Sequence, residues 1–387
     1  MASLLLAVIY LAFISLGLPD SLLGAGWPAM HGFFSAPLSA AGVISMVISG
    51  GTIVSSLASE RLIRRLGTRM VTLLSVLLTA GALWGFSVST RFWMLCVWAV
   101  PYGLGAGSID AAMNNYVALH YTSRDMSWLH CFWGVGTIIS PQIMSRALIR
   151  ASWQAGYRTV SLIQLGIAAV LLLTLPLWRV HAETAPGEER GSVLGIRGAL
   201  RLRGAPELLC AFFCYCSAES VCMLWAASYL VTVRGVGVER AAAFASLFFI
   251  GMTAGRFLAG FLSNRLGDRN MIRLGFAVAA AGVAVTGLPG LPDTAALAGL
   301  VIVGLGCAPV YPSIIHSTPA LFGAENSRGL IGLEMASAYA GSTFMPPLFG
   351  VISAGLGMGI LPLFVGGFLI GMILLAERVR KKTEQTG

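Results

Sequence analysis

Charged side chains are scarce in this chain. Asp, Glu, Lys and Arg make up 11% of its 387 residues, while apolar residues make up 57%. Soluble domains have about 25% and 45–50% respectively. A bilayer needs this composition, because a spanning helix requires about 20 mostly apolar residues. We therefore expect an all-α membrane protein, and its 47 glycines suit helices that approach closely in lipid.

The chain also lacks the usual signatures of metal, nucleotide and nucleic-acid chemistry. Its seven cysteines lie in apolar stretches, four of them within residues 207–231, which predicts small packing residues and no metal site. No phosphate-binding glycine loop indicates direct drive by ATP. The net charge of +9 forms no basic stripe on a soluble domain, so we expect no nucleic-acid partner. No segment could form a soluble catalytic domain, so we expect no enzyme.

Two short strings in this chain are nearly identical. Arg65-Leu66-Gly67-Thr68-Arg69 and Arg265-Leu266-Gly267-Asp268-Arg269 lie 200 residues apart, each between two long apolar segments. An offset of about half the chain indicates a duplicated membrane unit, and such units are typical of transporters.

The apolar segments divide into two sets of six around one polar stretch. The predicted spans are 4–31, 37–59, 70–89, 92–120, 127–149, 157–178, 207–231, 239–263, 271–289, 295–319, 329–352 and 356–376. The long polar stretch, 180–205, falls at the midpoint. We predict an N-terminal six-helix half (1–179), a cytoplasmic linker (180–205) and a C-terminal six-helix half with a short basic tail (206–387). The two halves should be pseudo-symmetric.

Basic residues set the expected orientation. If both termini and the even-to-odd connections face the cytoplasm, 18 of the 25 Lys and Arg residues lie on that side and six on the other. Such a bias is typical of cytoplasmic loops. We expect a monomer in a bacterial inner membrane, surrounded by lipid, with both termini in the cytoplasm.

Few ionisable residues fall inside the spans, and each is expected to face a cavity or a partner because burial in lipid is costly. Asp20 lies about 25 Å along span 1 and Asp110 about 27 Å down span 4 at ~1.5 Å per residue, which puts them at different depths. Two carboxylates at different depths suit stepwise proton transfer. We predict Asp20, Asp110 and Glu219 as proton-coupling residues, with the proton as coupling ion and no other cofactor.

Polar and aromatic side chains accompany these acids at helical spacing. Asn114 shares a helix face with Asp110, and aromatic residues follow the acids of spans 1 and 7. Carboxylate and amide groups with an aromatic plane can bind a sugar, although the same residues also occur as structural links and interface aromatics. The predicted substrate-binding residues are Asp20, Trp27, Asn114, His130, Trp133, Trp225 and Tyr229.

The loop after span 8 carries a recognisable motif. The segment from Gly255 to Arg269 resembles the cytoplasmic loop signature of the major facilitator superfamily, with Asn264 where that family has an acid. In the first-half copy Glu60 replaces the glycine. The resemblance implies two six-helix halves that expose a central site alternately to each side. It also implies a conformational lock, to which we assign Arg65, Arg69, Arg256, Gly260, Arg265, Gly267, Arg269 and Glu334.

A narrower resemblance points to one branch of this superfamily. Pro19-Asp20-Ser21, the Asp110 to Asn115 segment and Gly255-Arg256-Phe257 are similar to helices 1, 4 and 8 of the fucose–proton symporter family. Trp128 to Gly136 resembles helix 5 of related sugar permeases. The resemblance implies proton-coupled uptake of a small polar solute, with a sugar as first candidate.

Two other functions stay open at this point. One is proton-driven export of a drug or an amphipathic metabolite, and the other, more distant, is a membrane enzyme or receptor. Within the second half, Arg256 and Glu334 lie in the cytoplasmic portions of helices that the resemblance makes neighbours. We therefore predict that they form an ion pair or share a polar network, because an unpaired charge at that depth would be costly. The alternative is that Glu334 lies in the cavity as a coupling acid, with Arg256 bonded to helix-end carbonyls.

Overall fold

The computed structural model describes residues 2–37, 40–178, 195–236, 238–288 and 290–384, and all regular structure in these ranges is helical. The helices of the first half are α1 (Ala2–Asp20), α2 (Leu22–Phe33), α3 (Ala41–Val88), α4 (Phe92–His120), α5 (Ser123–Arg150), α6 (Trp153–Leu173) and the short 3₁₀ helix η2 (Leu175–Trp178). The helices of the second half are α8 (Gly195–Arg201), α9 (Ala205–Arg234), α10 (Val238–Gly287), α11 (Asp293–Cys307), α12 (Val310–Phe322), α13 (Ala324–Leu356), η3 (Met358–Ile360) and α14 (Leu361–Glu384).

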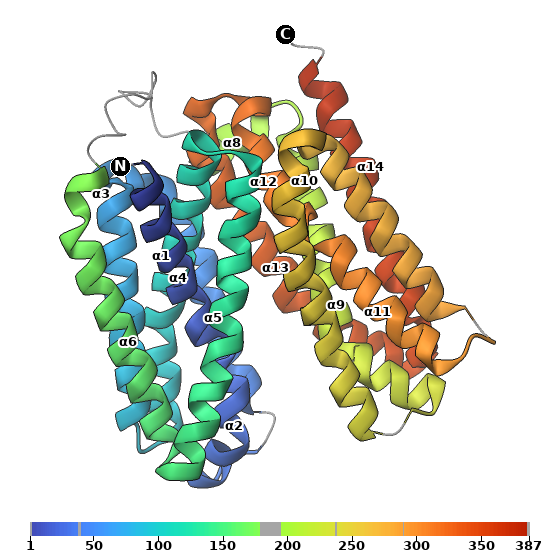
Figure 1. Cartoon of the computed structure of the whole chain (residues 1–387), viewed down its shortest axis with the longest axis horizontal. Coiled ribbons are helices and arrows are strands. Elements are labelled where there is room, and N and C mark those ends of the chain that lie inside the picture. Colours follow the sequence, from blue (N-terminus) through green and yellow to red (C-terminus); the bar gives the residue numbers. More distant parts are fainter. Residues whose placement is uncertain (1, 38–39, 179–194, 237, 289, 385–387) are drawn as a thin grey trace. The chain divides into compact units, whose positions relative to one another are not determined.

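The chain forms two compact units. Unit 1 comprises residues 1–116 and 129–195, and unit 2 comprises 117–128 and 196–387. In Figure 1 each unit is a bundle of long helices, blue to green in unit 1 and mostly yellow to red in unit 2. The connection between α4 and α5 belongs to unit 2 although its flanking helices lie mainly in unit 1. Of the predicted linker, residues 180–194 lie outside the described residues, and the end of it forms α8.

Eight helical stretches in the described residues are long and apolar enough to cross a membrane. Two of them, within α3 and α10, each contain two predicted spans joined end to end. The remaining two predicted spans correspond to α5 and α13, which are long enough but more polar. Predicted spans 1 and 10 are each broken into two helices, after Asp20 and after Cys307.

The continuous helices α3 and α10 bend at equivalent glycines. Gly67 has φ 75° and ψ 154°, and Gly267 has φ 72° and ψ 161°, although both lie inside long helices. This backbone region is essentially restricted to glycine. The matching conformations, 200 residues apart, show that the two near-identical strings fold alike, as expected of a duplicated unit.

Close glycine contacts also repeat at this offset. A Cβ at Gly103 of α4 would clash with the carbonyl of Ile48 in α3. A Cβ at Gly304 of α11 would clash with the carbonyl of Phe248 in α10. Each unit therefore sets the same pair of helices close together through glycine, which fixes the position of the polar residues further along α4.

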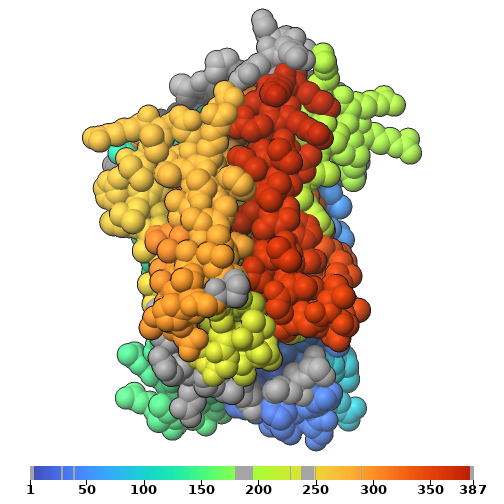
Figure 2. All heavy atoms as spheres, turned by 90° about the vertical axis from the view of Figure 1, so that its right-hand side faces the viewer, coloured from blue at the N-terminus to red at the C-terminus, as the bar shows by residue number. Residues whose placement is uncertain are grey.

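Large apolar side chains remain exposed on the outer helices. On α14 these include Leu363, 79% exposed, and Leu374, 58% exposed. Figure 2 shows α14 (red) as a long exposed strip beside the orange segments of α10 and α11. An apolar surface of this extent is costly in water and suits contact with lipid tails.

Candidate functional site

The first polar cluster of unit 1 forms where span 1 breaks. Asp20 ends α1, Ser21 separates it from α2, and Pro19 precedes it without a backbone N–H to donate. Broken helices at membrane depth are tolerated where they line a cavity, and they commonly carry substrate or ion sites. The break presents a carboxylate that keeps accessible surface.

Two aromatic side chains orient the Asp20 carboxylate. The Tyr102 hydroxyl donates to Oδ1 at 2.8 Å, and the Trp133 indole N–H donates to Oδ2 at 2.8 Å. Tyr102 is buried on α4, whereas Trp133 on α5 is half-buried. The carboxylate is thus held by one donor on each oxygen, and its remaining lone pairs can accept hydrogen bonds from a ligand.

Close packing of α1 against α5 places Trp133 beside Asp20. A Cβ at Gly17 would clash with the carbonyl of Trp133, and a Cβ at Gly136 would clash with the carbonyl of Ile14. Below Asp20, the Ser21 hydroxyl donates to the carbonyl of Thr137 at 2.7 Å. The two helices therefore touch through their backbones, and the position of the indole follows from that contact.

The second polar cluster of unit 1 is buried and lies between α4 and α5. The Asn114 amide donates to Asp110 Oδ1 at 2.7 Å and to the Asp110 carbonyl at 2.9 Å. His130 Nε2 lies 3.1 Å from Asn114 Oδ1. Because the two contacts to Asp110 fix the amide orientation, Oδ1 must accept, and Nε2 carries a hydrogen. Asp110, Asn114 and His130 are at most 5% exposed.

The two clusters share one face of α4. Tyr102, Asp110 and Asn114 are separated by multiples of four residues, so they lie in one row. Eight residues separate Tyr102 from Asp110, or about 12 Å at ~1.5 Å per residue. Two levels of α4 thus face two carboxylates: Tyr102 donates to the accessible Asp20 of α1, and the buried Asp110 lies on α4 itself. Sequence reasoning missed Tyr102, although its spacing from Asp110 was a usable signal.

Trp27, predicted to stack on a solute, lies in the packing of unit 1. It is 3% exposed, and its ring meets Phe92 edge-on at 6.2 Å between centroids. Trp133, also predicted to contact the solute, is the aromatic residue that the fold brings to Asp20. Substrate contact by either residue stays a prediction, and the geometry favours Trp133.

In unit 2 the acid of span 7 is paired with an arginine. Glu219 Oε1 lies 3.9 Å from Arg256 Nη2, and both side chains are largely buried. The predicted ion pair between Arg256 and Glu334 is therefore wrong. The Arg256 guanidinium reaches α9, while Glu334 Oε1 on α13 lies within hydrogen-bond distance, 2.7 Å, of Thr318 Oγ1 on α12. The arginine therefore has a different partner from the predicted one.

The two aromatic residues predicted on span 7 both bond to backbone carbonyls. The Trp225 indole donates to the Pro346 carbonyl at 2.9 Å, and the Tyr229 hydroxyl donates to the Thr286 carbonyl at 3.1 Å. Tyr229 is buried and Trp225 is half-buried. Both residues link α9 to neighbouring helices, and their proposed contact with a solute stays a prediction.

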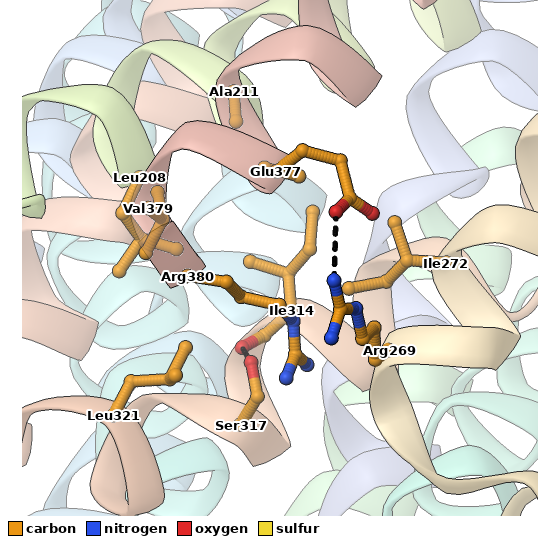
Figure 3. A pocket seen from close by; sticks show the side chains of 11 residues that line it. Leu208, Ala211, Arg269, Ile272, Ile314, Ser317, Leu321, Glu377, Val379 and Arg380 are labelled. Carbon is orange, nitrogen blue, oxygen red and sulfur yellow. Dashed lines mark hydrogen bonds and ion pairs between the residues drawn. The ribbon is translucent and has the colours of Figure 1, made fainter. Parts of the chain in front are cut away.

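The loop arginines that the second half contributes to the predicted lock lie at one end of unit 2. Arg269 Nη2 lies 3.2 Å from Glu377 Oε2, and Arg273 donates to both oxygens of the same carboxylate. Figure 3 shows Arg269 and Glu377 in contact, in the lining of a pocket to which Arg380 also contributes. These bonds tie the bend of α10 to α14. Arg65 and Arg265 are exposed and Arg69 is half-exposed in the corresponding bends.

Asp268 of the same loop holds the α4–α5 connection within unit 2. Ser123 donates to its Oδ1 at 2.6 Å, and His316 Nδ1 lies 2.7 Å from its Oδ2. The other imidazole nitrogen faces the Tyr121 carbonyl at 3.1 Å.

Burial raises the pKa of the Tyr121 phenol above its usual range, and the Asp125 carboxylate adds to that shift. Gly260 lies against the Trp128 indole, where a Cβ would clash.

The fold and the motif now define the class of protein. A family model described as Major Facilitator Superfamily matches residues 9–314 and 208–387. The chain belongs to the major facilitator superfamily, and it is a membrane transporter rather than an enzyme. Its all-helical structure follows the twelve-helix, two-half layout of that fold.

Relatives and solved structures agree with this assignment. The membrane protein MosC of Rhizobium meliloti is 25% identical over 344 residues, covering 87% of this chain and 80% of MosC. The fucose:proton symporter FucP of E. coli is 18% identical, with a TM-score of 0.73 over 97% of this chain and 98% of that one. The proton:xylose symporter XylE is 13% identical, with a TM-score of 0.78 over 95% and 94%. At such identities the structural likeness shows the fold alone.

Proposed function

We propose that this transporter carries a small polar solute, a sugar in the first instance, together with protons by alternating access. One observation supports the proposal most directly. An accessible carboxylate, Asp20, is oriented by Tyr102 and Trp133, and Asp110 bonds to Asn114, which contacts His130. On α4, Asp110 lies about 12 Å from Tyr102 at ~1.5 Å per residue.

Asp20 and Trp133 have the chemistry that a sugar requires. The carboxylate can accept hydrogen bonds from hydroxyl groups, and the half-buried indole offers an apolar plane for the C–H face of the ring. Because Trp133 donates to Asp20, the plane and the acceptor are held together before any solute arrives. Preorganisation of this kind lowers the ordering cost of binding.

Asp110 has the chemistry of a proton carrier. It is 4% exposed and accepts a hydrogen bond from the neutral Asn114 amide. Ionisation of a carboxyl group at such burial carries a large desolvation cost. A carboxyl group that changes between buried and hydrated surroundings can load and release protons. FucP and XylE are proton symporters, and we extend this mechanism to the present chain as part of the proposal.

Purified transporter in detergent provides the first test. We expect sugars, tested as a panel at increasing concentration, to raise the thermal unfolding midpoint, since a ligand that binds only the folded state stabilises it. Sugar uptake into proteoliposomes should then require an inward proton gradient. Stabilisation by amphipathic drugs and none by sugars would instead support the exporter alternative and overturn the proposal.

A further inference from the structure

Among the described residues of unit 2, Glu334 is the most deeply buried carboxyl group. Glu334 and its neighbour Thr318 are both 0% exposed. Glu334 Oε1 lies 2.7 Å from Thr318 Oγ1, and Oε2 is buried without a hydrogen-bond partner among the described residues. An ionised carboxylate would normally be paired with a cation or with several donors at such a position.

The hydrogen bonds around Thr318 show where a proton lies. Thr318 Oγ1 is also 3.2 Å from the carbonyl of Ile314, which can only accept. A threonine hydroxyl has a single hydrogen to donate. If Glu334 were ionised, two acceptors would compete for that hydrogen. If Glu334 is protonated, its O–H donates to Thr318, and the Thr318 hydroxyl donates to Ile314, so that both bonds form.

Three charged pairs lie on the helices around Glu334. On α9, Glu219 pairs with Arg256 and Glu207 pairs with Lys382. On α12, His316 contacts Asp268. The arginine that sequence reasoning assigned to Glu334 is therefore engaged with another acid. No cation in the described part of unit 2 is recorded in contact with the Glu334 carboxyl group.

We propose that Glu334 is a proton-binding site of unit 2, which holds a proton while buried and releases it to water when the site is hydrated. The step breaks one O–H bond, leaves a carboxylate and adds the proton to a water molecule. The site uses neither Asp20 nor Asp110, so it stands apart from the solute site in unit 1. A role for Glu334 in the transport cycle rests on the proposed proton coupling. The presence of a proton on Glu334 does not depend on that proposal.

Infrared spectroscopy of the full-length protein tests the proposal directly. A protonated carboxylic acid has a C=O stretching band separate from that of a carboxylate. We expect part of this band to disappear in Glu334→Gln. Glu377→Gln should leave the band unchanged, because Glu377 lies between Arg269 and Arg273 and is ionised. An identical band in wild type and Glu334→Gln would overturn the proposal.

Two further measurements test the assignment of the band to Glu334 and the release of its proton. Thr318→Val keeps the acid but removes its hydrogen-bond partner, so the Glu334 band should move to higher frequency, and an unmoved band would contradict the assignment. If Glu334→Gln fails to fold, the Thr318→Val variant still tests whether the band belongs to Glu334. Raising the pH on folded wild-type protein should reduce the Glu334 band. A band that persists until the protein unfolds would show that the folded protein never releases this proton, and it would overturn the proposed release.

Discussion

Asp20 and Glu219 are acids at similar positions of the two halves, but their carboxylates have different partners. They lie 199 residues apart, on the first helix of each half. Asp20 accepts from two aromatic donors and keeps accessible surface, whereas Glu219 faces the guanidinium of Arg256. The arginine compensates the charge of Glu219, so Asp20 is the acid better placed for a solute. A coupling role for Glu219 stays a prediction.

Replacing Asp20 should weaken solute binding. Asp20→Ala removes the acceptor and leaves the Tyr102 and Trp133 donors unsatisfied. We expect at least a tenfold loss of affinity, about 1.4 kcal/mol, by titration calorimetry with the best sugar of the panel. Asp293→Asn, which alters an exposed carboxylate at the start of α11, is the matched control. Unchanged affinity in Asp20→Ala would remove this residue from the binding site.

Replacing Asp110 should separate transport from its driving force. Asp110→Asn keeps the size of the side chain but cannot carry a proton. We expect proton-driven accumulation in proteoliposomes to be lost, while exchange of labelled for unlabelled solute continues in part. Exchange needs no net proton movement, so it tests binding and conformational change alone. Accumulation at the wild-type rate would show that Asp110 is not a proton carrier.

At the scale of the elements, glycine sets both the bends and the close contacts. α3 and α10 pass through the same glycine-only backbone conformation at Gly67 and Gly267. α1 and α5 approach through Gly17 and Gly136, which brings an aromatic donor to Asp20. Positions that look featureless in the sequence therefore decide the geometry of the polar residues.

Alanine at either bend should destabilise the protein. Gly67→Ala and Gly267→Ala would each force a residue with a Cβ into a disfavoured backbone region, at a cost of about 1–3 kcal/mol. We expect lower thermal midpoints for both. Gly81→Ala lies in α3 with open space around it, and it should be neutral or stabilising because alanine favours helices. Equal midpoints for all three variants would mean that the bends relax without strain.

At the scale of the whole molecule, charge and apolar surface place the chain in its membrane. Exposed leucines on α14 and the scarcity of charge suit a lipid surround. The basic residues of the loops and the tail predict that both termini face the cytoplasm. The six-helix halves of this fold make the number of crossings even, which agrees with termini on one side.

Fusion reporters can test the orientation in a bacterial host. Green fluorescent protein at the C-terminus should fluoresce, because it folds in the cytoplasm. Alkaline phosphatase at the same place should be inactive, since it needs the oxidising periplasm. Moving the phosphatase to the connection near 289–292, on the predicted outer side, should restore its activity. The reverse pattern would contradict the predicted orientation.

Much of the architecture could be predicted from the sequence. Scarce charge and long apolar segments required a helical membrane protein, because lipid leaves no other way to satisfy backbone groups along a single span. The repeated strings around Gly67 and Gly267 predicted the duplication, since only glycine adopts the backbone that both bends need. Asp110 and Asn114 could be paired in advance because four residues bring side chains together on one helix.

The tertiary structure alone decided which side chains meet across helices. Tyr102 and Trp133 reach Asp20 because glycines let α1 and α5 touch, and sequence spacing cannot encode that approach. Arg256 meets Glu219 and leaves Glu334 to Thr318, since the partner of a long side chain depends on the rotation of each helix about its axis. Composition and periodicity fix which residues are buried, but the packing of helices against one another fixes the partner of each buried charge.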